Sequence, residues 1–90
     1  PPTSISVGAD AVVVKGIAFN PKEISTGAGH TVTWIFDDTG LGHTVTADDG
    51  SFDSGTMSSG EFKRTFDGPG QIGYHCNVHA RMKGTIVVGS

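Results

Sequence analysis

The chain has 90 residues, of which 36% are hydrophobic, and its formal net charge at pH 7 is −3. This length suits one compact domain with a modest core, so we expect a single domain over residues 1–90. The 6 lysines and arginines are scattered, which argues against a nucleic-acid partner, because such proteins present a basic stripe. We also expect no membrane span, since no segment approaches the roughly 20 apolar residues of a transmembrane helix.

Short alternating or apolar runs predict strands, in chain order, at residues 5–7, 11–14, 24–26, 31–36, 43–46, 61–66, 72–76 and 85–88. The run 31–36 is the clearest, because Val32, Trp34 and Phe36 share one face by the period of two. We expect a bend at Phe19-Asn20-Pro21. No long segment shows the apolar spacing of a helix. Seven or eight short strands in this length predict an all-β fold, a β-sandwich.

Five aspartates fall within one third of the chain: Asp37, Asp38, Asp48, Asp49 and Asp53. We interpret them as residues of solvated loops rather than as an acidic docking surface.

The segment after the predicted strand 72–76 carries the most informative chemistry. Cys76, His79 and Met82 follow one another at three-residue steps, and Cys76 is the single cysteine, so no internal disulfide can form. Each residue alone is most simply a packing residue, but core residues on a strand alternate and these do not. One thiolate, two imidazoles and a weak axial thioether make a blue-copper site. The segment therefore supplies three of four copper ligands.

The second histidine ligand must come from elsewhere in the chain. His30 lies in a turn, and His75 adjoins Cys76, so on a strand it faces the opposite side. We favour His43, which begins a predicted strand 33 residues before Cys76. That separation is compatible with two parallel neighbouring strands whose ends meet at one pole of a sandwich.

Other chemistries use some of the same residues. A Cys–His nucleophile pair would include Cys76, but it leaves Met82 unexplained. A zinc site could use His43, Cys76 and His79, although a methionine in the fourth position disfavours zinc. A binuclear copper centre would need a second cysteine. Met57 has no cysteine or histidine near it in sequence, and we expect it at the surface or half-buried.

The chain resembles the cupredoxins, the type 1 blue copper proteins, and among them the amicyanin and plastocyanin group. The resemblance covers most of the chain and rests on Phe19-Asn20-Pro21, Ile24, Gly29, Val32, Trp34, Gly42-His43-Thr44-Val45, Phe62, Thr65-Phe66, Pro69-Gly70, Tyr74, Cys76, His79, Met82 and Gly84. The short ligand loop looks most like that of amicyanin. The resemblance implies an eight-strand Greek-key β-sandwich, with one copper ion near one pole held by His43, Cys76, His79 and Met82.

Three positions depart from the family pattern. Thr44 stands where relatives often have an asparagine that ties the two ligand loops together, and its single hydroxyl can do so less fully. Val78 stands where relatives often have proline, which adds a backbone N–H that can point to the thiolate. Arg81 and Lys83 place positive charge beside the expected contact face, which favours an acidic partner.

The resemblance also implies outer-sphere electron transfer with redox protein partners and no enzymatic activity. The partner would contact the face around His79, in an apolar patch that includes Leu41, Gly42, Val78 and Ala80. We expect a monomer in a periplasmic or extracellular setting, with a membrane anchor before Pro1 as an open alternative. Two rival functions are a copper carrier or scavenger, and a cupredoxin domain of a larger copper protein.

Overall fold

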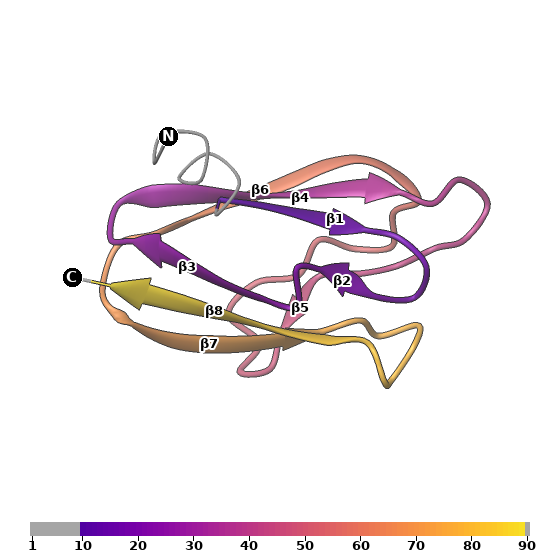
Figure 1. Ribbon diagram of the computed structural model, residues 1–90. Helices are drawn as coiled ribbons and strands as arrows, with labels where there is room; N and C mark the ends of the chain where they lie inside the picture. Colours follow the sequence, from indigo (N-terminus) through magenta and orange to yellow (C-terminus); the bar gives the residue numbers. More distant parts are fainter. Residues whose placement is uncertain (1–9, 90) are drawn as a thin grey trace.

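Two four-stranded β-sheets pack face to face in the computed structural model, which describes residues 10–89 (Figure 1). The strands are β1 (Ala11–Val14), β2 (Phe19–Asn20), β3 (Glu23–Gly27), β4 (His30–Asp37), β5 (Thr46–Ala47), β6 (Ser59–Phe66), β7 (Gly70–His75) and β8 (Lys83–Gly89). One sheet has the order β2-β1-β4-β6 and the other β3-β8-β7-β5. The expected eight-strand Greek-key β-sandwich is confirmed, while the predicted strand 5–7 lies outside the described residues.

Both sheets are mixed. β1 runs parallel to β4, and β3 runs parallel to β8, whereas the other pairs are antiparallel. Phe19 and Asn20 pair with β1 as a two-residue strand, where the sequence had indicated a bend. Between residues 10 and 89 the structure contains no helix, and so none that could cross a membrane.

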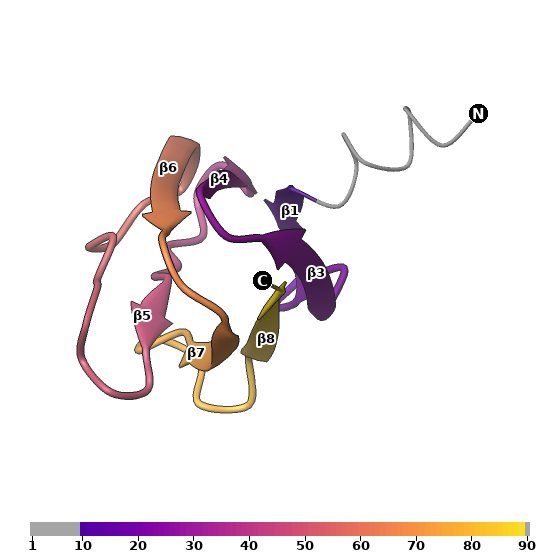
Figure 2. The same ribbon diagram turned by 90° about the vertical axis from the view of Figure 1, so that its left-hand side faces the viewer.

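The core lies between the two sheets. Val32, Trp34 and Phe36 point into it from β4 and are buried, as the period of two predicted. Seen end-on, β4 and β6 lie across this core from β7 and β8 (Figure 2). The Trp34 ring meets the ring of Tyr74 from β7 edge-on, with 5.4 Å between centroids. Aromatic contacts of this kind join the sheets and give the loops at each end a rigid support.

The pairing of β5 with β7 brings two distant segments of the chain to one end of the sandwich. The pair is antiparallel, with Thr46 opposite His75, so the expectation of parallel neighbours was wrong. The reason is that the chain doubles back beside β5 before β6 begins, with Thr46 bridged to Asp53 and His43 bridged to Met57. This extra reversal makes β7 run in the opposite direction to β5. In an antiparallel pair the start of one strand lies beside the end of the other. His43, just before β5, therefore lies next to Cys76, just after β7.

Candidate metal centre

Three connections gather at the right-hand end of Figure 1: the β1–β2 turn, the β4–β5 connection and the β7–β8 loop. Backbone bonds hold the residues of this end in place. His43 and Met57 exchange both backbone hydrogen bonds, at 2.9 and 2.8 Å, in an isolated bridge. In the β7–β8 loop, Cys76 N–H donates to the Met82 carbonyl at 3.0 Å, and Met82 N–H donates to the His79 carbonyl at 2.9 Å. The loop is thereby closed into a tight turn that carries three of the predicted ligands.

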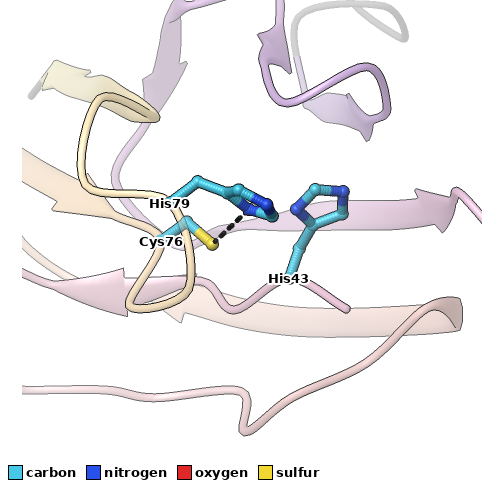
Figure 3. Close-up of side chains that lie close together, drawn as sticks. All are labelled: His43, Cys76 and His79. Atoms are coloured by element: carbon cyan, nitrogen blue, oxygen red, sulfur yellow. Dashed lines mark hydrogen bonds between the residues drawn. The ribbon is translucent and has the colours of Figure 1, made fainter. Parts of the chain in front are cut away.

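The structure brings His43, Cys76 and His79 together. One potential ligand atom from each lies within 4.8 Å of the others. The His79 Nδ1 atom is 3.8 Å from Cys76 Sγ, and the two imidazole centroids are 5.0 Å apart (Figure 3). His43 and Cys76 are buried, whereas His79 is half-buried and reaches the surface. This arrangement shields the thiol and leaves one imidazole edge open to a neighbour.

The two nitrogens of His43 have different environments. Nε2 lies 2.8 Å from an oxygen of Asp38. Nδ1 is buried and has no hydrogen-bond partner among the described residues. An unsatisfied buried polar atom costs about 1–3 kcal/mol, and a metal ion at the centre of the cluster would satisfy it. The donor set therefore fits a soft or borderline metal such as copper.

Thr44 joins the two ligand loops. Its N–H donates to Cys76 Sγ at 3.4 Å, and its hydroxyl oxygen accepts the Asn77 N–H at 2.8 Å. The Thr44 hydroxyl also pairs with that of Thr46 at 2.9 Å. The expected tie through Thr44 is confirmed. Among the described residues, Cys76 Sγ contacts only this amide and His79 Nδ1 as polar partners, so the bond expected from Val78 N–H is not formed.

The two remaining histidines lie outside the cluster. His30 is exposed at the start of β4, at the far end from the β4–β5 connection, with Nδ1 3.4 Å from Asp10. His75 uses Nδ1 towards Asp48 at 2.6 Å and Nε2 towards Asn77 at 3.0 Å. Of these three histidines, His43 is the one that lies in the cluster with Cys76 and His79 among the described residues. Met82 is buried on the ligand loop, and Met57 is half-buried against the core, as expected.

Sequence reasoning missed two features of this end of the molecule. Asp38 was assigned to the solvated loops, yet its side chain is only 22% exposed and contacts His43. The hydrogen bond from His43 lowers the pKa of the Asp38 carboxyl below its ordinary value. Ile17 lies in the β1–β2 turn with φ at 58°, and it lines a hollow together with Gly16, His79, Ala80 and Arg81. For Ile17 the only available signal was an apolar residue directly after a turn glycine.

Comparison with known proteins agrees with this geometry. A plastocyanin from Scenedesmus fuscus is 32% identical over 99 residues, which cover 94% of this chain and 97% of the relative. An oxidised amicyanin variant superposes with a TM-score of 0.79 and 27% identity, over 91% of this chain and 83% of that one. A copper-containing nitrite reductase from Thermus scotoductus reaches a TM-score of 0.80 at 27% identity, over 89% of this chain but only 22% of the enzyme. The profile of copper-binding proteins of the plastocyanin/azurin family matches residues 5–89, and the chain belongs to that family.

Proposed function

We propose that this protein carries single electrons between redox partners, with one type 1 copper ion held by His43, Cys76, His79 and Met82. The observation that carries the proposal is the convergence of two imidazoles and a buried thiol within 4.8 Å, with the inner nitrogen of His43 left unpartnered. The similarity to a plastocyanin and to amicyanin supports it. When bound, copper supplies a one-electron couple between Cu(II) and Cu(I).

The side chains present suit copper better than zinc. The Cys76 thiolate and the His43 and His79 imidazoles would satisfy either metal. Met82, buried in the same loop, offers a thioether, which is a soft donor typical of the axial position in blue-copper sites and unusual for zinc. We propose Met82 as the fourth, axial ligand on this ground.

The scaffold is suited to electron transfer because it restrains each ligand. His43 is held by Met57 on the backbone side and by Asp38 on the ring side. Thr44 and Asn77 fasten the Cys76 loop to the His43 segment. Ligands that move little between the two oxidation states keep the rearrangement that accompanies each transfer small. We infer that the chain has no catalytic activity of its own, since His30 and His75 form no second metal-binding group among the described residues.

The partner is proposed to contact the face around His79. Ile17 and Val78 are the large apolar residues most exposed among those described, at 40% and 50%. Ala80 is exposed and adjoins Ile17 in the hollow beside His79. The cations Lys22, Arg81 and Lys83 line the adjoining hollow. This combination favours a redox protein whose contact surface is apolar at its centre and acidic at its rim.

Family membership also informs the setting and the extent of the protein. We propose a periplasmic or extracellular location and a monomer whose residues 1–90 form one domain. The match to part of a nitrite reductase keeps a second candidate open, in which this domain serves a larger copper protein.

The test begins with Cu(II) added to the purified protein and a visible spectrum. We expect an intense thiolate-to-copper band that disappears on reduction and is absent in Cys76→Ser. A colourless protein that binds zinc instead would contradict the proposal.

A second measurement separates electron transfer from copper delivery. Fast electron self-exchange with slow transfer of Cu(I) to a chelator is expected, whereas rapid loss of Cu(I) to the chelator would favour a copper carrier or scavenger.

A further inference from the structure

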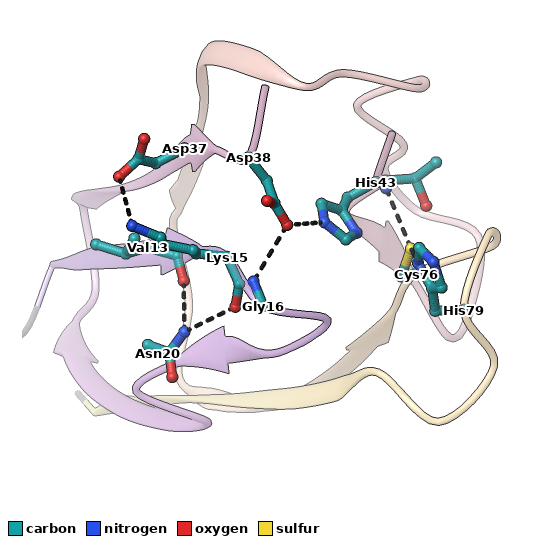
Figure 4. A network of polar contacts seen from close by, with 10 residues as sticks. Val13, Lys15, Gly16, Asn20, Asp37, Asp38, His43, Cys76 and His79 are labelled. Atoms are coloured by element: carbon teal, nitrogen blue, oxygen red, sulfur yellow. Dashed lines mark hydrogen bonds and ion pairs between the residues drawn. The ribbon is translucent and has the colours of Figure 1, made fainter. Parts of the chain in front are cut away.

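One carboxylate oxygen joins the buried histidine of the centre to the turn on the surface beside it. Asp38 directly follows β4, and its Oδ2 atom lies 2.8 Å from His43 Nε2 and 3.1 Å from the backbone nitrogen of Gly16 (Figure 4). The His43 ring is fully buried, and the Asp38 side chain is 22% exposed. The same oxygen therefore contacts a predicted copper ligand and a loop 22 residues earlier in the chain.

The contact with His43 determines which nitrogen carries the proton. An ionised carboxylate only accepts hydrogen bonds, so His43 Nε2 must be the donor. The lone pair of a neutral ring then resides on Nδ1, which is the nitrogen without a partner. A ring nitrogen bonded to a carboxylate in this way is held in one tautomer and one orientation, and the basicity of the other nitrogen rises.

The contact with Gly16 reaches the surface. Gly16 and Ile17 line the hollow that also contains His79, Ala80 and Arg81. Both residues have positive φ, 68° for Gly16 and 58° for Ile17. A β-branched residue is strained in this region and needs restraint from its surroundings. The bond from Gly16 N–H to Asp38 provides such a restraint at the start of the turn.

We propose that Asp38 is a positioning residue of the copper centre, which fixes the His43 ring for metal binding and fastens the Gly16–Ile17 turn beside His79. The copper part of this inference rests on the proposed function, but the hydrogen bonds themselves do not. Through one carboxylate, the buried side of the centre is linked to the face that a partner would contact.

Metal-free protein tests the hydrogen bonds directly. Nitrogen-15 shifts of the His43 ring should show a proton on Nε2 in the wild type and in Asp38→Asn, whose amide oxygen still accepts. In Asp38→Ala the two tautomers should mix, and the Gly16 amide should exchange with solvent faster. A wild-type ring protonated on Nδ1, or a Gly16 amide equally protected in all three proteins, would overturn the proposal whatever metal the site takes.

Copper-loaded protein tests the consequence. Asp38→Ala should weaken Cu(II) binding by about 10–100-fold, the usual effect of losing a partner of a metal ligand. Asp38→Asn should retain most of the affinity but raise the reduction potential, because the lost negative charge stabilised Cu(II) more than Cu(I). A tenfold difference between the two oxidation states corresponds to about 59 mV for one electron.

Asp37→Asn is the matched control. Asp37 is the preceding residue, 66% exposed and 3.8 Å from Lys15, so the variant removes the same charge without touching His43. Equal potentials and affinities in the Asp37 and Asp38 variants would overturn the positioning role. If Asp38→Ala does not fold, the comparison of Asp38→Asn with Asp37→Asn still decides it. A wild type without the thiolate-copper band would contradict the proposed function alone, because the tautomer and exchange measurements are made without metal.

Discussion

The amide of Thr44 donates to the sulfur of Cys76 at 3.4 Å, and this bond crosses from the segment of one predicted ligand to the loop of the others. The Thr44 hydroxyl extends the same link by accepting the Asn77 N–H at 2.8 Å. Backbone and side chain of a single residue therefore hold the two ligand segments together. The backbone bond survives substitution of Thr44, whereas the side-chain bond does not, and the two contributions can be separated.

Thr44→Val removes the hydroxyl and leaves the amide in place. We expect the free energy of unfolding to fall by about 1 kcal/mol, because the Asn77 N–H loses its partner. The thiolate-copper band should persist, since the bond to sulfur comes from the backbone. Thr44→Ser retains the hydroxyl and serves as the control. Denaturant unfolding of both variants measures the difference, and a serine variant no more stable than the valine variant would contradict a role for the hydroxyl.

Met82→Leu tests the axial ligand. Leucine keeps the apolar volume of this buried position but has no sulfur donor. Copper should remain bound by the other three ligands. The reduction potential should rise, because a lost donor weakens Cu(II) binding more than Cu(I) binding, by about 59 mV for each tenfold difference. Voltammetry measures the change, and an unchanged potential would remove Met82 from the ligand set.

The candidate ligands in the β7–β8 loop could be identified from the sequence because their chemistry is local. Cys76, His79 and Met82 follow one another within one turn, and residue type and spacing are enough to indicate a metal. His43 lies in one cluster with Cys76 and His79, but the strand direction that accompanied its choice was wrong. Pairing direction depends on how often the chain reverses between the two strands, and here it doubles back beside β5 before β6 begins. The number of residues between two strands does not determine that.

The roles of Asp38 and Ile17 could not be predicted for a different reason. Asp38 is one of five aspartates in the same part of the chain, and only its tertiary contact with His43 distinguishes it from the solvated ones. Ile17 acquires its position when the β1–β2 turn meets the β7–β8 loop. Neither contact has a sequence periodicity or motif, because each depends on how separate loops meet at one end of the sandwich.

Burial of Tyr74 should make the free energy of unfolding fall at alkaline pH. Tyr74 is the single tyrosine, and burial raises its pKa from 10.0 to about 12. Between these values the unfolded chain releases a proton that the folded protein retains. Stability is therefore complete below about pH 10 and falls as the pH rises towards 12, by up to about 3 kcal/mol. Urea unfolding at several pH values measures the slope.

Tyr74→Phe is the control for that slope. The hydroxyl has no hydrogen-bond partner among residues 10–89, so its removal should cost little stability at neutral pH. The variant should lose the part of the alkaline slope that Tyr74 contributes. Phenolate absorbance titrated in the folded wild type provides an independent check, and a midpoint near the ordinary value would contradict the predicted burial of the hydroxyl.

We expect the Ile17 side chain to lower the stability of the fold but to favour contact with a redox partner. The φ of 58° at Ile17 suits glycine and strains a β-branched side chain, at a cost of about 1–3 kcal/mol. Ile17→Gly should therefore be more stable than Ile17→Ala by about 1 kcal/mol, because alanine retains the strain. Both variants lose the side chain beside His79, so both should slow electron transfer to the physiological partner. Reduction of the copper by a small inorganic reductant should stay near the wild-type rate. Thermal unfolding and stopped-flow kinetics measure the two effects. An alanine variant as stable as the glycine variant would show that the turn is not strained, and unchanged partner kinetics would place the contact face away from Ile17.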